Sequence, residues 1–184
     1  LPGPYDTAIW PTIMTRTGAA ERVFYIHDCT NAVLRRVTIT GGYKKLSGGG
    51  VYLDKARATF DSCVIATNQT FNADNWGQAY GAGIYSVNSV VVFTNSVLKA
   101  NTFANTPFYG RGGGAYVSGG DWTITHSVVV SNTVLGWYDN VAYGAGFFFE
   151  GGNHRLLNTL VADNNSGFYA DGIYANAGLQ LSNC

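Results

Sequence analysis

Two stretches of the chain share one pattern: residues 49–68 read GGVYLDKARATFDSCVIATN, and residues 82–101 read AGIYSVNSVVVFTNSVLKAN. In each, a glycine precedes an aliphatic residue and a tyrosine, and an asparagine ends the stretch. The same frame recurs from Gly114 and from Gly146, and a shorter copy starts at Gly172. The length from glycine to asparagine does not change, so all variation falls in the segment after the asparagine. A fixed frame of this kind indicates a repeat protein.

Within each repeat, apolar residues alternate with polar residues at period two. They are rich in β-branched and aromatic types, which indicates β-strands and not helices. The only proline within the repeats is Pro107, which lies in a variable segment and interrupts no predicted strand. Two sets of equivalent positions are predicted to be buried: Phe60, Phe93, Ile124 and Leu156 in the first, and Ile65, Leu98, Val129 and Val161 in the second.

Short strands that recur once per repeat can stack in parallel, about 4.8 Å apart, around one continuous core. We therefore predict an all-β chain that forms a parallel β-helix, a solenoid of about six coils with long loops on one edge. Residues 1–22 are predicted to be a lead-in and opening coil, and residues 23–184 a single repeat domain. The repeat pattern stops at Cys184 without a capping helix, so we expect a segment of a longer chain or of an end-to-end assembly, and not an isolated monomer.

Composition excludes several classes of partner. With 46% hydrophobic and 12% charged residues, the chain can bury a core and does not resemble a disordered segment. Lysine plus arginine equals aspartate plus glutamate at 11 each, so no overall field attracts nucleic acid. The longest apolar runs are far shorter than the ~20 residues that span a bilayer. We expect no nucleic-acid partner and no membrane insertion.

Asparagine recurs at the end of every complete repeat. Its side-chain amide can bond backbone groups that a turn leaves unpaired, and it tolerates left-handed backbone. We interpret this set as a structural column: Asn68, Asn101, Asn132 and Asn164. A second turn column is interpreted in the same way, with His126 as a turn substitute and not a catalytic base: Ser62, Asn95, His126, Asn158 and Asn183.

The three cysteines are predicted to be free, mostly buried thiols. Cys63 and Cys184 fall at equivalent points four coils apart, about 19 Å, which exceeds the ~7 Å limit for a disulfide. Cys29 belongs to a different side of its coil. The two glycosylation sequons, which begin at Asn68 and Asn164, use asparagines of the turn column, so we interpret them as coincidental.

Aromatic residues gather in the variable loops, which stacking in register would crowd along one edge. Rings on long loops suit sugar faces or a protein partner, although the loops could instead fold over the flank and bury their own rings. The candidate binding residues are Phe71, Trp76, Tyr80, Phe103, Phe108, Tyr109, Trp137, Tyr138, Tyr143, Phe168 and Tyr169. A second row is expected to point outward and to stabilise the strands by stacking: Tyr25, Tyr52, Tyr85, Tyr116, Phe148 and Tyr174.

Catalytic and metal-binding patterns are weak. The best polar group combines Glu150, His154 and Arg155 with Asp121 from the preceding repeat, and a solvated polar face is the favoured interpretation. The loop acids form a weaker calcium candidate without a known ligand spacing: Asp74, Asp139 and Asp171. We predict no catalytic residue, no metal site and no cofactor.

The repeats carry a family resemblance. Gly-Gly-Gly-Val-Tyr at residues 48–52 and Gly-Ala-Gly-Ile-Tyr at residues 81–85, with Phe-Asp-Ser-Cys-Val-Ile-Ala-Thr-Asn and its variants, resemble right-handed parallel β-helix proteins of bacterial surfaces. They are similar to repeats of polymorphic outer-membrane proteins and autotransporter passengers. The resemblance implies a right-handed coil and an extracellular or cell-surface location, and it leaves activity open because this architecture hosts unrelated functions.

Three functions of different classes remain. The favoured hypothesis is a structural and adhesive module that assembles with itself or within a larger chain and binds glycans or partners through the aromatic loops. The alternative is a fragment of a polysaccharide-active lyase, hydrolase or epimerase. Ice binding would need a flat threonine column, but Thr38 and Thr40 recur only as Thr123 and Thr125 at a shifted position.

Overall fold

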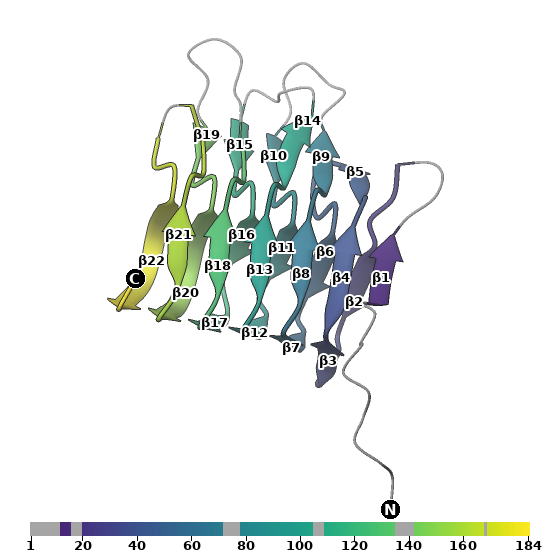
Figure 1. Cartoon of the computed structure of the whole chain (residues 1–184), viewed down its shortest axis with the longest axis horizontal. Helices are drawn as coiled ribbons and strands as arrows, with labels where there is room; N and C mark the ends of the chain where they lie inside the picture. The colour runs from purple at the N-terminus through teal and green to yellow at the C-terminus, as the bar shows by residue number, and fades with distance from the viewer. Residues whose placement is uncertain (1–11, 16–19, 72–77, 105–108, 135–141, 168) are drawn as a thin grey trace, which may run out of the picture.

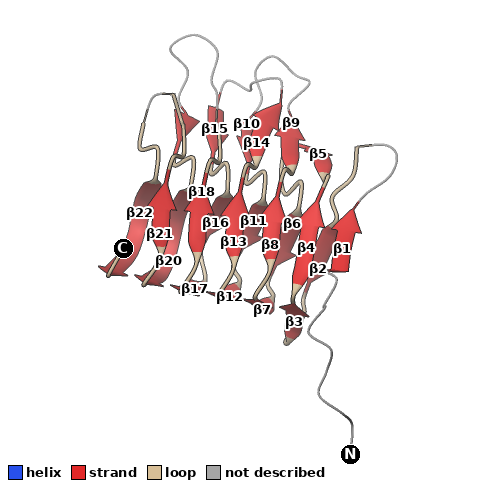
Figure 2. Cartoon of the chain, in the orientation of Figure 1, coloured by secondary structure: helices blue, strands red, loops and turns tan. Residues whose placement is uncertain are grey.

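The computed structural model describes residues 12–15, 20–71, 78–104, 109–134, 142–167 and 169–184. All regular elements in these residues are β-strands, and Figure 2 draws them with connecting loops only. Every strand pair is parallel. The predicted all-β class and parallel pairing are confirmed. Among the described residues, no helix is long and apolar enough to cross a membrane.

Each repeat contributes strands to three rows. The first row contains β2 (Phe24–His27), β6 (Val51–Asp54), β11 (Ile84–Val87) and β16 (Ala115–Ser118). The second row contains β3 (Ala32–Arg35), β7 (Arg57–Asp61), β12 (Val90–Thr94) and β17 (Asp121–Thr125). The third row contains β1 (Thr12–Thr15), β4 (Val37–Thr40), β8 (Val64–Ala66), β13 (Val97–Lys99), β18 (Val128–Val130) and β21 (Leu160–Ala162).

Two long strands join the first row to the second. Strand β20 (Phe147–Leu157) pairs with β16 at its start and with β17 at its end, and β22 (Ile173–Ser182) pairs along β20. The resulting ten-stranded sheet begins at β2 and returns to β3, so it is nearly closed. The third row forms a separate six-stranded sheet. The handedness and the number of coils stay predictions.

The loops carry two small sheets along one edge, at the top of Figure 1. The first contains β5 (Tyr43–Lys45), β9 (Gln69–Phe71) and β14 (Thr102–Ala104). The second contains β10 (Gln78–Tyr80), β15 (Tyr109–Arg111) and β19 (Ala142–Tyr143). The variable segments therefore leave the rows on the same side in successive repeats.

The core lies between the rows. In the second row, Phe60 pairs with Phe93, Phe93 with Ile124, and Ile124 with Leu156, and all four side chains are fully buried. This is the stack that the repeat frame predicts. Ile65, Leu98 and Val129 are also buried, whereas Val161 is half-buried. Alternation places these apolar side chains on one face of each strand.

The repeat-ending asparagines form a buried hydrogen-bonded ladder. The Asn101 Oδ1 accepts from the backbone N–H of Asn68 at 3.1 Å and from its side-chain Nδ2 at 3.0 Å. Asn132 accepts in the same way from Asn101, and Asn164 from Asn132. Each Nδ2 also donates to a carbonyl of the preceding repeat, as Asn101 does to Ile65 at 3.0 Å. The ladder thus pairs backbone N–H groups that the corner would leave buried without partners, and it also bonds carbonyl groups of the third row.

The glycines before each first-row strand are explained by this ladder. A Cβ on Gly83 would lie 2.5 Å from the Gly114 carbonyl oxygen and 2.9 Å from the Asn101 side chain. A Cβ on Gly50 would meet Gly83 and Asn68 at similar distances. The glycine and asparagine of the repeat frame are therefore in contact, and the glycine leaves the room that the amide needs.

A second ladder of small side chains runs between the second and third rows. The Ser96 hydroxyl accepts from the Cys63 backbone N–H at 2.9 Å and donates to the Thr94 carbonyl at 2.6 Å. Ser127 repeats this arrangement one repeat later. Cys63 occupies the same position, and its buried Sγ lies 3.3 Å from the Leu34 carbonyl. All three cysteines are free, as predicted, but the expectation of mostly buried thiols is wrong: Cys63 is buried, Cys29 is half-buried and Cys184 is exposed.

The turn between the second and third rows has left-handed backbone in every repeat. His126 has φ 49° and its exposed ring lies 3.1 Å from the Asn158 side chain. The other members are Arg36, Ser62, Asn95, Asn158 and Asn183, with φ between 50° and 56°. His126 therefore occupies a turn position, as its place in the second column indicates.

Replacing Asn101 with alanine is expected to lower the free energy of unfolding by about 3 kcal/mol or more. The change leaves the buried Asn68 backbone N–H without a partner, at about 1–3 kcal/mol, and it removes hydrogen bonds to the Ile65 carbonyl and from the Asn68 side chain, at about 0.5–1.5 kcal/mol each. Urea denaturation followed by circular dichroism measures the loss. Asn95→Gly is the control, because Asn95 is exposed at φ 50° and glycine keeps that backbone. Equal losses in the two variants would contradict the role of the ladder.

Candidate functional site

The loop edge holds part of the predicted aromatic binding set. Phe71, Tyr80, Phe103, Tyr143 and Tyr169 are described with their side chains, and Tyr109 with its backbone alone. The remaining candidates lie outside the described residues: Trp76, Phe108, Trp137, Tyr138 and Phe168.

The described loop rings differ in their exposure. Phe103 is 4% exposed and packs in a small cluster with Ala79, Val134 and Ala142, so its ring stabilises the loop sheets and does not face a ligand. Phe71 is half-buried and stacks on Tyr43, with 4.4 Å between ring centroids. Tyr169, in contrast, is 56% exposed. The edge therefore combines rings that pack the loops with at least one ring that faces solvent.

The outward aromatic row lies under the second loop sheet. Tyr85 stacks on Tyr116 at 5.3 Å, Tyr116 on Phe148 at 5.4 Å, and Phe148 on Tyr174 at 4.9 Å. Because each ring covers the face of the next, only the edges of these rings are turned away from the row. Tyr116 and Phe148 are 5% and 2% exposed because the loop strands cover them. This row stabilises the first-row sheet, as expected from cross-strand aromatic pairing.

Tyr80 and Tyr143 connect the loop sheet to that row. Tyr80 lies 4.7 Å from Tyr116 between ring centroids, and Tyr143 lies 4.7 Å from Tyr174. Tyr143 also stacks on Tyr169 at 5.2 Å, which continues the aromatic surface to solvent. Desolvation by burial raises the pKa of Tyr85 to about 12, so this phenol stays protonated at neutral pH.

Arg111 and Glu150 occupy the middle of this aromatic surface. The Arg111 guanidinium lies 5.2 Å from the Phe148 ring centroid and 3.8 Å from the Glu150 carboxylate. The Tyr116 hydroxyl donates to the Glu150 carboxylate, and burial followed by this hydrogen bond raises the pKa of Tyr116. Glu150 is thus engaged with the aromatic row and does not join the group with His154 and Arg155 that the sequence favours.

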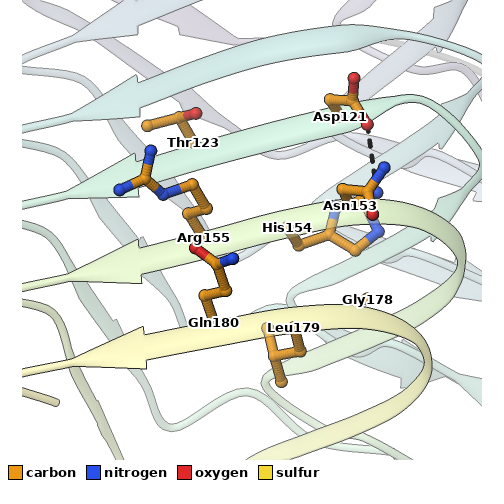
Figure 3. A pocket seen from close by; sticks show the side chains of 8 residues that line it. All are labelled: Asp121, Thr123, Asn153, His154, Arg155, Gly178, Leu179 and Gln180. Carbon is orange, nitrogen blue, oxygen red and sulfur yellow. Dashed lines mark hydrogen bonds between the residues drawn. The ribbon is translucent and has the colours of Figure 1, made fainter.

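A groove lies on the outer face of the second row, across β17, β20 and β22 (Figure 3). Its volume is about 520 Å³, within the range of small-ligand sites. Thr123, Arg155 and Gln180 lie along one side and Asp121 and Asn153 along the other. The lining residues are Asp121, Thr123, Asn153, His154, Arg155, Gly178, Leu179 and Gln180.

His154 lines this groove, but its side chain is 1% exposed and stacks on the core ring of Phe149 at 4.2 Å. Its Nε2 lies 2.8 Å from the Gly151 carbonyl and donates to it, while its Nδ1 is buried without a partner. Desolvation by burial lowers the pKa of His154, so the ring is neutral. The interpretation of His154 as part of a solvated polar face is wrong: it alternates inward at the position of Trp122.

The described residues contain no group of three or more histidine, cysteine or acidic side chains that could hold a metal ion. Of the calcium candidates, Asp74 and Asp139 lie outside the described residues. Asp171 accepts from the backbone and hydroxyl of Ser166, at 2.7 and 2.8 Å, and these hydrogen bonds lower its pKa. The Asp171 carboxylate therefore caps a turn.

The two sequon asparagines, Asn68 and Asn164, belong to the buried ladder, with exposures of 0% and 8%. Their amide nitrogens donate to backbone carbonyls and, for Asn68, to the next asparagine. A glycan on either amide is incompatible with this structure.

No family model, curated protein or solved structure matches the chain.

The stability of the fold is expected to fall as the pH is lowered from about 8 to about 5, because of His154. The unfolded chain has an ordinary histidine pKa near 6.5, and the folded pKa is lower, so the unfolded state binds more protons in this range. Urea denaturation as a function of pH measures the slope. His154→Leu should flatten it, whereas His126→Gln, at an exposed turn, should leave it unchanged. An identical slope in wild type and His154→Leu would contradict the assignment.

Proposed function

We propose that the chain is a segment of a right-handed parallel β-helix that serves as an extracellular structural and adhesive module of a bacterial surface. Three rows of parallel strands with equivalent residues in register support the β-helix. The two internal ladders support a stiff scaffold, because each side chain bonds the backbone of the neighbouring repeat. The scaffold holds the loops along one edge, where binding residues are most useful.

The loop edge with its aromatic residues is called the aromatic edge below. Its exposed end is the observation that carries the adhesive part of the proposal. Tyr169 is 56% exposed, and its ring is held by stacking on Tyr143, which packs in turn on Phe148 and Tyr174. A rigid, partly exposed aromatic ring gives contact area at little entropic cost. Glycans or a protein partner are the ligands that suit it, and Trp76 and Trp137 are proposed to extend the same contact.

Tyr169→Ala is expected to weaken binding of the chain to a glycan array at least about tenfold, without a change in melting temperature, because exposed aromatic anchors contribute about 2 kcal/mol to recognition. Trp76→Ala and Trp137→Ala should have the same effect. Tyr25→Ala is the matched control, since Tyr25 is a tyrosine of 57% exposure at the other end of the outward aromatic row, in β2. A lower melting temperature with full glycan binding in the loop variants would contradict the proposal. An equal loss of glycan binding in Tyr25→Ala would also contradict it.

The proposed partner in assembly is a further set of the same strands, from a second copy or from flanking coils of a longer chain. The outer edge of β22 supports this, because among the described strands β22 pairs with β20 alone and Leu181 is 54% exposed. Unpaired strand edges with apolar side chains are templates for strand addition.

Light scattering is expected to give a mass that rises with concentration, and Leu181→Lys should reduce this rise because it places a charge on the contact face. Gln180→Lys is the matched control, because its side chain lies on the opposite face of β22. A constant monomer mass at all concentrations would contradict self-assembly of this chain.

A further inference from the structure

We propose that the groove across β17, β20 and β22 is a second binding site, and that it takes a sugar carrying a carboxylate. It lies on the outer face of the second row, whereas the aromatic edge is built from the loops beside the first row. The proposal therefore does not depend on ligand binding at the aromatic edge.

Arg155 is the group that selects an anion. It is exposed, and no ion pair or hydrogen bond engages its guanidinium within the described residues. Arg35 and Arg111, in contrast, lie near Asp61 and Glu150. A free guanidinium at a groove wall presents a planar set of donors that matches a carboxylate with two parallel hydrogen bonds.

Asp121 limits which anion can bind. It lines the opposite wall, and its carboxylate accepts from the Asn153 backbone N–H at 3.1 Å, which holds it there and away from Arg155. A ligand with several negative charges, such as a polyphosphate, would meet this carboxylate. A ligand with one carboxylate at Arg155 and hydroxyl groups at Asp121 would instead donate hydrogen bonds to it.

The remaining walls suit hydroxyl groups. Thr123 and Gln180 lie in register on either side of Arg155, and the Asn153 side chain lies beside Asp121 (Figure 3). Together these side chains offer both donors and acceptors. The backbone groups of β17 and β20 are paired on both sides in the parallel ladder, so among the strands of the groove only the outer edge of β22 could add an extended peptide.

Gly178 opens the space for the ring. Gly178 pairs with Asn153, which pairs in turn with Asp121. Because glycine has no side chain, the position next to those of Asp121 and Asn153 stays open. A Cβ at this position would lie 2.7 Å from the Asn153 Oδ1. The two walls are two residues apart along each strand, about 7 Å, which accommodates one pyranose ring between them.

Isothermal titration of the 184-residue chain with a tetrasaccharide of alternating glucuronic acid and N-acetylglucosamine tests the site. We expect binding that Arg155→Gln weakens about tenfold or more, since a hydrogen bond to a charged group contributes about 1.5–3 kcal/mol. A neutral tetrasaccharide of N-acetylglucosamine should bind the wild type at least about tenfold more weakly. Arg57→Gln is the matched control, because Arg57 is an exposed arginine of the same row outside the groove.

Gly178→Ala gives a second variant that keeps the charge and narrows the hollow, and it should also weaken binding. Tyr169→Ala should leave this binding unchanged, which separates the groove from the aromatic edge. Three results would overturn the proposal: no binding by folded wild type, equal binding of the neutral sugar, or full binding by Arg155→Gln. Loss of binding in Tyr169→Ala alone would assign the acidic sugar to the loops and overturn the groove site.

Discussion

Hydrogen bonding between the asparagine side chains of successive repeats is the interaction on which the rest of the structure depends. At the corner after the third row, the chain turns away from its neighbours and would leave the backbone N–H of each asparagine buried without a partner. Each asparagine bonds one N–H and one carbonyl of the preceding repeat, and it also bonds the asparagine there. Because one side chain satisfies three groups, no apolar residue of similar size can replace it.

This ladder fixes the register of the other rows. An asparagine can bond its neighbour only when the two repeats are aligned, so Phe60 meets Phe93 and Tyr85 meets Tyr116 in the same register. The ladder also excludes a side chain at Gly83 and at the equivalent glycines, because a Cβ there would be too close to the asparagine. The long insertions fall after the asparagine, where the loops leave the rows, whereas the turn between the first and second rows varies by one residue. The position of the aromatic edge is therefore a consequence of the buried polar ladder.

Much of the fold could be predicted from the sequence because its determinants are periodic. Alternation identifies Phe93 as buried, and the constant frame identifies Asn101 as a member of a column. The loops could not be predicted in this way: Phe103 and Tyr169 both follow the asparagines, yet one is buried and the other is exposed. Their difference depends on the path of the loop strands, which no local pattern encodes.

The groove was predicted only in part: the sequence groups Arg155 with His154 and Asp121, which line it, but not with Gly178 and Gln180. It requires Arg155 to lie beside Gln180 and Gly178 to lie beside Asn153, and the pairing of β20 with β22 shifts register between Glu150 and Asn153. Counting residues from the glycine of each repeat assumes a constant spacing, so it does not predict that shift in the pairing. The buried position of His154, in contrast, was available from alternation, since it is equivalent to Trp122.

Hydrogen exchange of the asparagine side-chain amides, measured by NMR on the folded chain, tests the central role of the ladder most directly. The Nδ2 protons of Asn101 and Asn132 are donated to carbonyl groups in a buried environment, so they should exchange only when the rows open. They should therefore be protected to the same extent as the backbone amides of β12 and β13, while those of exposed Asn95 exchange rapidly. Exchange of the Asn101 amide at the rate of Asn95 would contradict the account.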